Sequence, residues 1–294
     1  MVQKSAGSGH VVLLVAAGLA VTGLASEVRA DDAPVNASTS TDKSQYNLFN
    51  VTPASQLRPL SADTDDGVTD PTTVDAGYVE VQGSLVNYYR YDNDYGPVHF
   101  SEDHFAWAPR ITLGVLNNVD LFIHPSFQVT SYQYTGPFNA SGSSSGYDGI
   151  NIGAKINLWG NDGGKTALAV APYISIPNGG DTVEGGADIP FAVRLPYEFY
   201  LKFVFDPYAF ENHHTIYFGM DNSMSLHKGF GTKLDVYAYL NTTYRSDSEP
   251  WYGYTGFGAG YLFSPNVEVF LGIGFGLTDN AYDYNPRLGL AWRF

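Results

Sequence analysis

The stretch VEVFLGIGFG at residues 267–276 decides the fold of this chain. Apolar residues recur at every second position from Val267 to Phe275, and the alternate positions from Glu268 to Gly276 carry Glu268, Phe270 and three glycines. Successive side chains of a strand point to opposite faces. The period of two therefore predicts a β-strand with one continuous apolar face and one face of small or charged residues.

The same alternation continues from residue 77 to the end of the chain, interrupted by turn residues. Most of the predicted strands are about 9 to 16 residues long, whereas strands of soluble sheets have about 5 to 6 residues and a bilayer needs about 9 to 11. We expect twelve strands, near residues 77–91, 104–116, 119–134, 149–159, 165–176, 185–195, 199–208, 214–226, 232–245, 252–263, 267–276 and 286–294.

The charged residues of these strands fall opposite the apolar residues. A soluble sandwich or lipocalin-like barrel also alternates, but its apolar face turns inward and its strands are shorter. Backbone groups in lipid must all be paired, so strands with an apolar outer face must close. We therefore predict an all-β fold, a transmembrane antiparallel β-barrel of about twelve strands in an up-and-down meander. The residues expected to line its lumen are Glu80, Arg110, Asp120, His124, Lys155, Asp188, Arg194, Lys202, Asp206, Asp221, Lys233, Asp235, Glu268, Arg287 and Arg293.

The connections between strands alternate in length, as in bacterial outer-membrane barrels. With both termini periplasmic, we expect short periplasmic turns at 117–118, 160–164, 196–198, 227–231 and 264–266. The longest outer loops are expected at 92–103 and 135–148. The terminal Phe294 on an amphipathic last strand resembles the signal read by the barrel-assembly machinery. The expected location is the outer membrane of a Gram-negative-type bacterium, with lipid and lipopolysaccharide as partners.

The N-terminal part of the chain has a different composition. Residues 1–30, with an apolar core from Val11 to Ala25, have the pattern of a secretory signal peptide, and a membrane anchor is the alternative. Residues 31–75 form an irregular acidic segment, which leaves 76–294 for the barrel. The acidic cluster of Asp63, Asp65, Asp66 and Asp70 lacks the spacing of an EF-hand loop, so we expect a solvated linker there.

Composition excludes several classes of protein. The 294 residues include 15 Lys and Arg against 30 Asp and Glu, a net charge of −15, which argues against nucleic acid as a partner. The chain has no cysteine, so disulfides, thiolate metal sites and cysteine nucleophiles are absent. Neither a G-x-S-x-G nor an H-E-x-x-H motif occurs. We expect no enzyme activity, no metal and no cofactor.

Several segments resemble the family named for the MetA pathway of phenol degradation, whose members are bacterial outer-membrane transporters. They are TVDAGYVEVQGSLVNY at 73–88, LGVLNNVDLFI at 113–123, NLWGNDGGKTALAVAPYISIP at 157–177, SPNVEVFLGIGFGLT at 264–278 and NPRLGLAWRF at 285–294. The turn NLWGNDGGKTALA is the most specific of them. The resemblance implies an outer-membrane barrel that passes small aromatic or hydrophobic solutes.

The charges allow more than one function. A twelve-stranded barrel is narrow, and its inward acids and bases could form a selective constriction or a salt-bridge network that fills the lumen. An outer-membrane enzyme acting on lipid and a closed structural barrel are the alternatives to a channel. The acidic outer loops could bind divalent cations and lipopolysaccharide, or serve only solubility. Their acids are Asp92, Asp94, Glu102, Asp103, Asp148, Asp181, Glu184, Glu211, Asp247, Glu249, Asp279 and Asp283.

Overall fold

The computed structural model describes residues 42–60, 67–179, 183–212, 215–247 and 251–294. The predicted signal peptide lies outside these residues, as do Asp63, Asp65 and Asp66. The strands, in chain order, are β1 (Val79–Tyr95), β2 (Val98–Trp107), β3 (Arg110–Leu116), β4 (Val119–Thr135), β5 (Ala140–Trp159), β6 (Thr166–Pro177), β7 (Glu184–Leu195), β8 (Phe199–Asn212), β9 (Thr215–Phe230), β10 (Leu234–Arg245), β11 (Tyr252–Ser264), β12 (Val267–Gly276) and β13 (Tyr284–Arg293).

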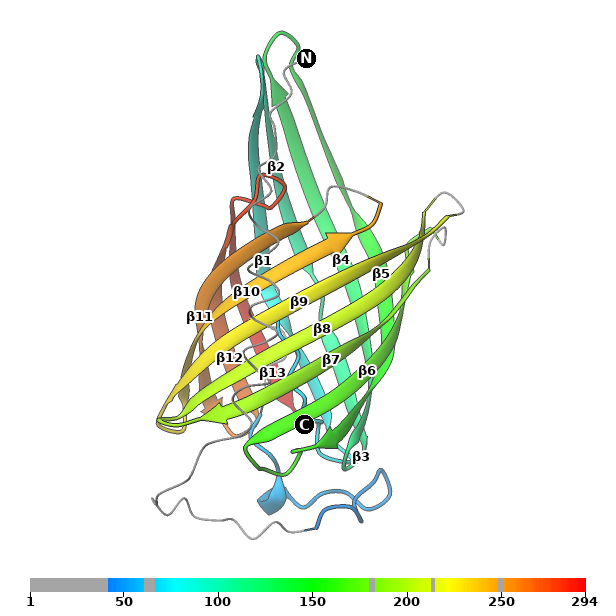
Figure 1. Ribbon diagram of the computed structural model, residues 1–294, viewed down its shortest axis with the longest axis vertical. Helices are drawn as coiled ribbons and strands as arrows, with labels where there is room; N and C mark the ends of the chain where they lie inside the picture. The colour runs from blue at the N-terminus through cyan, green and yellow to red at the C-terminus, as the bar shows by residue number, and fades with distance from the viewer. Residues whose placement is uncertain (1–41, 61–66, 180–182, 213–214, 248–250) are drawn as a thin grey trace. The chain divides into compact units, whose positions relative to one another are not determined.

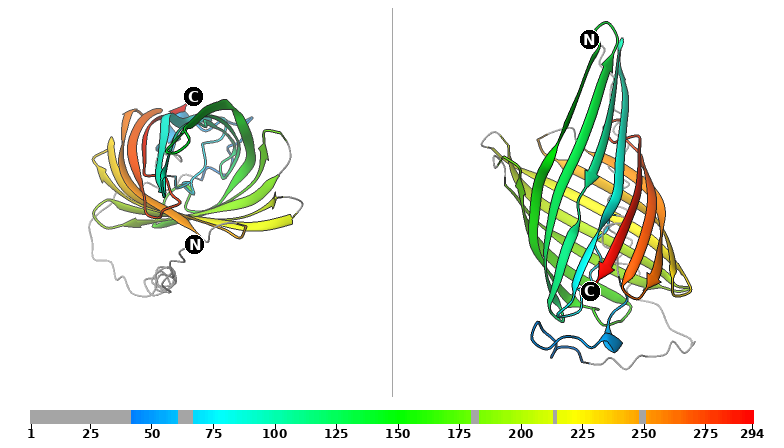
Figure 2. Two further views of the ribbon diagram at one scale, coloured as in Figure 1. Left: turned by 90° about the horizontal axis from the view of Figure 1, so that it is seen from above. Right: turned by 180° about the vertical axis from the view of Figure 1, so that it is seen from behind.

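The strands form a closed antiparallel barrel (Figures 1 and 2). Apart from β2 and β3, each strand pairs with its neighbour in sequence, and β1 pairs with β13 from Glu80↔Arg293 to Arg90↔Tyr284, which closes the ring. Strands β2 and β3 are two halves of one wall position, because both pair with β1 and both pair with β4. The barrel therefore has twelve wall positions, as the sequence predicts.

The prediction of one continuous strand at 104–116 was wrong. Strand β2 begins earlier, at Val98, and the chain leaves the ladder at Ala108 and Pro109 before β3 begins. Proline has no N–H to donate, so it breaks a ladder that would otherwise continue.

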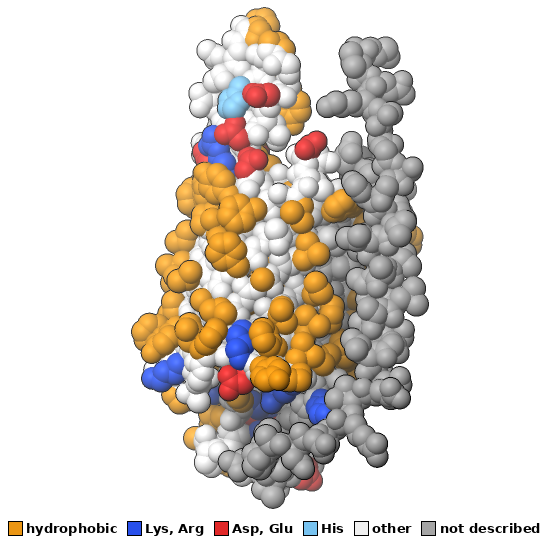
Figure 3. Space-filling model, turned by 60° about the vertical axis from the view of Figure 1, so that its left-hand side comes forward, with side chains coloured by type: hydrophobic (Ala, Val, Ile, Leu, Met, Phe, Trp, Pro, Cys, Tyr) orange, Lys and Arg blue, Asp and Glu red, His pale blue; other side chains and the backbone are white. Residues whose placement is uncertain are grey.

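The apolar face of each strand points outward. Leu271 is 59% exposed and Leu121 is 50% exposed, whereas the alternate positions Ala169 and Ala171 are fully buried. On the wall shown in Figure 3, hydrophobic side chains form a belt, and charged side chains lie mainly above and below it. Within the described part of the chain, no helix has the length and apolarity to cross a membrane.

Two hairpins extend the wall where loops were expected. Strands β1 and β2 continue to a turn at 96–97, and β4 and β5 continue to a turn at 136–139. The predicted loops at 92–103 and 135–148 are therefore mostly strand. Cross-strand aromatic pairs stabilise these extensions, including Phe100 and Tyr134, whose ring centroids are 4.8 Å apart.

The N-terminal segment enters the barrel. Its described part contains one short regular element, the 3-10 helix η1 (Ala54–Gln56), and Val68, Asp75 and Ala76 are fully buried. The blue residues at the start of this segment lie beyond the ends of the strands, at the same end of the barrel as the C-terminus (Figures 1 and 2, right). The expectation of a solvated linker was wrong for Asp70, which is only 5% exposed, because polar side chains of the inner wall surround it. We call residues 67–76 the plug.

Candidate functional site

The plug is held by side chains of several wall strands, among them β4, β5 and β8. We call the end of the barrel where Val79 meets Phe294 the periplasmic end, following the expected orientation. There the Lys155 ammonium donates to the carbonyl of Asp70 (3.1 Å) and the Lys202 ammonium to that of Val68 (3.4 Å). From β4, the Asp120 carboxylate accepts the backbone N–H of Val74 (3.0 Å). Residues predicted to line the lumen therefore form hydrogen bonds with backbone N–H and carbonyl groups of the plug.

The Asp70 side chain is also satisfied. Its carboxylate accepts bonds from the Tyr200 hydroxyl (3.2 Å) and from the Thr72 N–H (2.8 Å) and hydroxyl (2.6 Å). Burial by itself would raise the pKa of Asp70, but the Lys202 charge and the Thr72 bonds hold it below the ordinary value. Asp70 is therefore a docked carboxylate.

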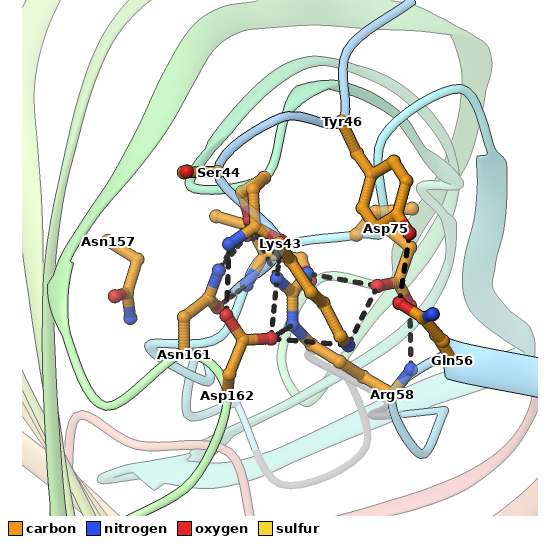
Figure 4. Close-up of polar contacts among 12 residues, drawn as sticks. Lys43, Ser44, Tyr46, Gln56, Arg58, Asp75, Asn157, Asn161 and Asp162 are labelled. Atoms are coloured by element: carbon orange, nitrogen blue, oxygen red, sulfur yellow. Dashed lines mark hydrogen bonds and ion pairs between the residues drawn. The ribbon is translucent and has the colours of Figure 1, made fainter. Parts of the chain in front are cut away.

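A second group of charges fixes the plug to the wall (Figure 4). The fully buried Asp75 accepts the Arg58 N–H at 2.7 Å, and its oxygens lie 3.4 Å from the Arg58 guanidinium, 3.6 Å from the Lys43 ammonium and 3.7 Å from the Arg293 guanidinium. A buried carboxylate is tolerated only when it is paired in this way. We call Lys43, Arg58, Asp75, Asp162 and Arg293 the plug anchor.

Asp162 brings the turn between β5 and β6 into the plug anchor. Its carboxylate lies 3.0 Å from the Arg58 guanidinium and 3.2 Å from the Lys43 ammonium, and it accepts a bond from Asn117 (2.9 Å). Burial acts to raise the pKa of Asp162, but the Asn117 bond and the two cations hold it below the ordinary value. This turn belongs to NLWGNDGGKTALA, so the most specific segment of the resemblance is the one that binds the plug.

An acidic cavity lies beyond the plug. It has a volume of about 160 Å³, and its lining includes Gly67 and Thr69 of the plug and the carboxylates Asp188, Asp206 and Asp221 of β7, β8 and β9. The Tyr173 hydroxyl donates to Asp206 at 3.0 Å. One wall of the lumen thus gathers three acids at the surface of the plug.

Four tyrosines gather at the outer end of the inner wall. Tyr282, on the connection between β12 and β13, is buried although it belongs to an outer loop. Its ring centroid lies 4.8 Å from that of Tyr89, 5.0 Å from that of Tyr254 and 6.1 Å from that of Tyr91. We call these four residues the tyrosine mouth.

Two arginines occupy the wall opposite the acids. The Arg287 guanidinium lies 4.9 Å from the ring centroid of Tyr239, and that of Arg110 lies 3.9 Å from the ring centroid of Phe122. Both stack on aromatic faces, the geometry of a cation–π contact. By contrast, Arg90 higher on the same wall pairs with Asp92 and Asp103.

The structure separates the predicted lumen residues into groups. Asp120, Lys155, Lys202 and Arg293 meet at the plug, whereas Arg194 and Lys233 are exposed at the periplasmic rim. Lys233 precedes the first residue of β10, and Arg194 is the penultimate residue of β7, where the wall ends. The other predicted residues on the inner wall are Glu80, Arg110, His124, Asp188, Asp206, Asp221, Asp235, Glu268 and Arg287.

Ser225, His227 and Asp235 form a hydrogen-bonded row that no sequence motif indicated. The Ser225 hydroxyl lies 3.0 Å from Nε2 of His227, and Nδ1 of His227 lies 2.5 Å from Asp235. His227 was expected in a turn, but β9 continues to Phe230 and places it on the inner wall. His227 follows Ser225 by two positions, and this spacing could have indicated that both side chains lie on the same face of one strand. No cluster of three or more metal-ligating side chains occurs among the described residues.

Comparison with known proteins identifies the family. The family model described as "Putative MetA-pathway of phenol degradation" matches residues 86–294. The chain belongs to this family. The match begins within β1, so the plug and the plug-anchor residues Lys43, Arg58 and Asp75 precede the matched part of this phenol-degradation family member.

A solved outer membrane channel has the same fold, and two further barrels are similar at lower scores. An outer membrane channel from Pseudomonas putida F1 matches with a TM-score of 0.54 at 12% identity, covering 83% of this chain and 98% of that chain. The translocator domain of the autotransporter NalP from Neisseria meningitidis gives 0.48 at 12% identity, with 74% and 88% covered. The NanC porin gives 0.47 at 8% identity, with 73% and 98% covered. No curated protein sequence matches the chain. This family member is an outer-membrane β-barrel of the Gram-negative type.

Proposed function

We propose that this barrel is a gated channel for small aromatic or hydrophobic solutes, and that the plug closes it. The observation that carries the proposal is the placement of residues 67–76 inside a closed barrel, on side chains of the inner wall. A lumen that served only as a packed core would need no separate segment to fill it. The tyrosine mouth supplies flat apolar surfaces that suit an aromatic solute.

The plug can leave without opening the barrel. Its contacts with the wall are mostly side-chain bonds and ion pairs, while the wall is held by the continuous ladder from β1 to β13. Ion pairs and hydrogen bonds exchange for water at a small net cost, about 0.5–1.5 kcal/mol for a typical hydrogen bond. We therefore infer that gating consists of the plug leaving the wall, with the barrel unchanged.

Conductance of a weakened anchor tests the proposal. Asp75→Asn removes the charge that faces Arg58, Arg293 and Lys43, so the reconstituted variant should show a higher open probability in planar bilayers than the wild type. The matched control is Asp42→Asn, because Asp42 is exposed and bonds only Ser44 within the described residues. A folded Asp75→Asn variant with wild-type conductance would contradict the gate.

The Ser225 row favours a second candidate, an enzyme. A serine, a histidine and a carboxylate in this order can generate a nucleophile. However, Ser225 is 1% exposed, faces the lumen instead of lipid, and pairs on both sides with Lys202 and Tyr239. We propose that the row is an interior hydrogen-bond network and that the protein is not an enzyme. Labelling by a fluorophosphonate that is lost in Ser225→Ala would overturn this.

A further inference from the structure

Two buried guanidinium groups of the inner wall have no acidic partner among the residues that the structure describes. Nε and Nη2 of both Arg110 and Arg287 lack a hydrogen-bond acceptor, and no carboxylate of the described residues lies within 4 Å of either guanidinium. Arg110 is only 6% exposed. An unsatisfied buried charge costs several kcal/mol, so such a group in a native structure needs an explanation.

The other bases of the lumen are already engaged. Lys155 and Lys202 bind plug carbonyls, Arg293 binds Asp75, and Arg90 binds Asp92 and Asp103. The acids Asp188, Asp206 and Asp221 are on the opposite wall, where they share their own cavity. A salt-bridge network that fills the lumen would bring the two arginines and these acids together, and the structure keeps them on separate walls.

Arg110 and Arg287 lie beside the same strand, β1, at two levels between the tyrosine mouth and the plug. Arg110 pairs in register with Gln82 of β1, and Arg287 pairs with Asn87 of the same strand. At about 3.4 Å per residue, five positions along a strand correspond to roughly 17 Å. Tyr239 backs Arg287, and Phe122 backs Arg110. We call Arg110 and Arg287 the arginine track.

We propose that the arginine track binds small aromatic carboxylates as they cross the lumen, an inference that rests on the proposed channel. The guanidinium fork of each arginine matches a carboxylate, which would supply the missing acceptor. The ring of the solute would first contact the tyrosine mouth and then stack beside Tyr239 or Phe122. The track thereby selects solutes that carry both an aromatic ring and a negative charge.

The experiment compares benzoate with benzamide, which has the same ring and no charge. Both are applied to liposomes containing the full chain, wild type and Asp75→Asn, and uptake is followed by swelling. Benzoate should enter faster than benzamide. Arg110→Gln and Arg287→Gln should each reduce benzoate uptake about tenfold, as expected for a lost charge-assisted bond, and leave benzamide uptake unchanged.

Lys233→Gln is the matched control, because it removes one positive charge at the exposed periplasmic rim, away from the track. It should leave the uptake of both solutes unchanged. Heat-modifiable gel mobility shows that each variant is folded. Equal, measurable uptake of the two solutes in the Asp75→Asn background, or loss of benzoate uptake in Lys233→Gln to the same extent as in the track variants, overturns the track and leaves the channel standing. A failure of both solutes to enter in both backgrounds overturns the channel and the track together.

Discussion

At the scale of single residues, the paired charges of the plug show what alternation can and cannot predict. The period of two is sufficient to place Asp120, Lys155 and Lys202 on the inner wall, where they lie buried. It could not place Arg58 or Asp75, because an irregular segment has no period and its partners are far away in the chain. Only the fold brings Arg58 to Asp162 and Asp75 to Arg293.

The carboxylates of the plug make the gate sensitive to acid. Both Asp70 and Asp162 have a pKa below the ordinary value of 3.8 when the plug is docked. Their contribution to docking is therefore complete above that value, and it is lost as the pH falls below it. Open probability in planar bilayers should rise between pH 4 and pH 3, about the range of an ordinary carboxyl titration, and less steeply in Asp162→Asn. Constant open probability down to pH 3 would contradict this account.

Glycines beneath the lumen tyrosines have no room for a side chain. A Cβ on Gly258 would collide with the Tyr237 ring and the carbonyl of Leu271. Gly258→Ala should therefore lower the free energy of unfolding by about 1–3 kcal/mol, measured by urea titration in lipid vesicles. Gly229→Ala is the matched control, since a Cβ there meets no atom within 4 Å. An equal effect of both substitutions would contradict the packing argument.

At the scale of elements, the strands were predictable because successive residues of each strand alternate between its outer and its inner face. The break between β2 and β3 was missed, since Ala108 and Pro109 keep the apolar pattern while leaving the ladder. The long hairpins were also missed: their outer ends at 92–103 and 135–148 have polar, turn-like compositions, yet they pair strand to strand. Alternation of apolar residues therefore marks the part of a strand that faces lipid, and it does not mark where pairing ends.

The plug as an element can be locked by a disulfide. The Thr73 hydroxyl lies 2.8 Å from the Asn161 amide nitrogen, and the natural chain has no cysteine to compete. A Thr73→Cys, Asn161→Cys double variant should conduct little when oxidised and regain conductance when dithiothreitol is added. The single variants, treated in the same way, should not respond to the reductant. Full conductance of the oxidised and cross-linked double variant would show that the plug does not gate.

At the scale of the whole molecule, acidic and basic side chains of the lumen occupy different walls of the barrel. The wall that faces lipid is apolar, the acidic cavity is on β7 to β9, and the arginine track is on β3 and β13 beside β1. The sequence predicted that the charged side chains would face inward, because the alternation of residues along a strand shows which of its faces is polar. It could not predict which wall each charge would occupy, since that depends on the order of strands around a closed ring.

The ion pair between Asp75 and Arg293 has a consequence for assembly. Asp75 comes just before the first strand, Arg293 ends the last strand, and these two strands form the seam that closes the ring. This ion pair therefore joins the segment inside the lumen to β1 and β13, the two edge strands whose pairing closes the ring last. We expect zipping of the seam and threading of the N-terminal segment to be a single concerted step of biogenesis, so that a newly inserted barrel is sealed from the moment it closes.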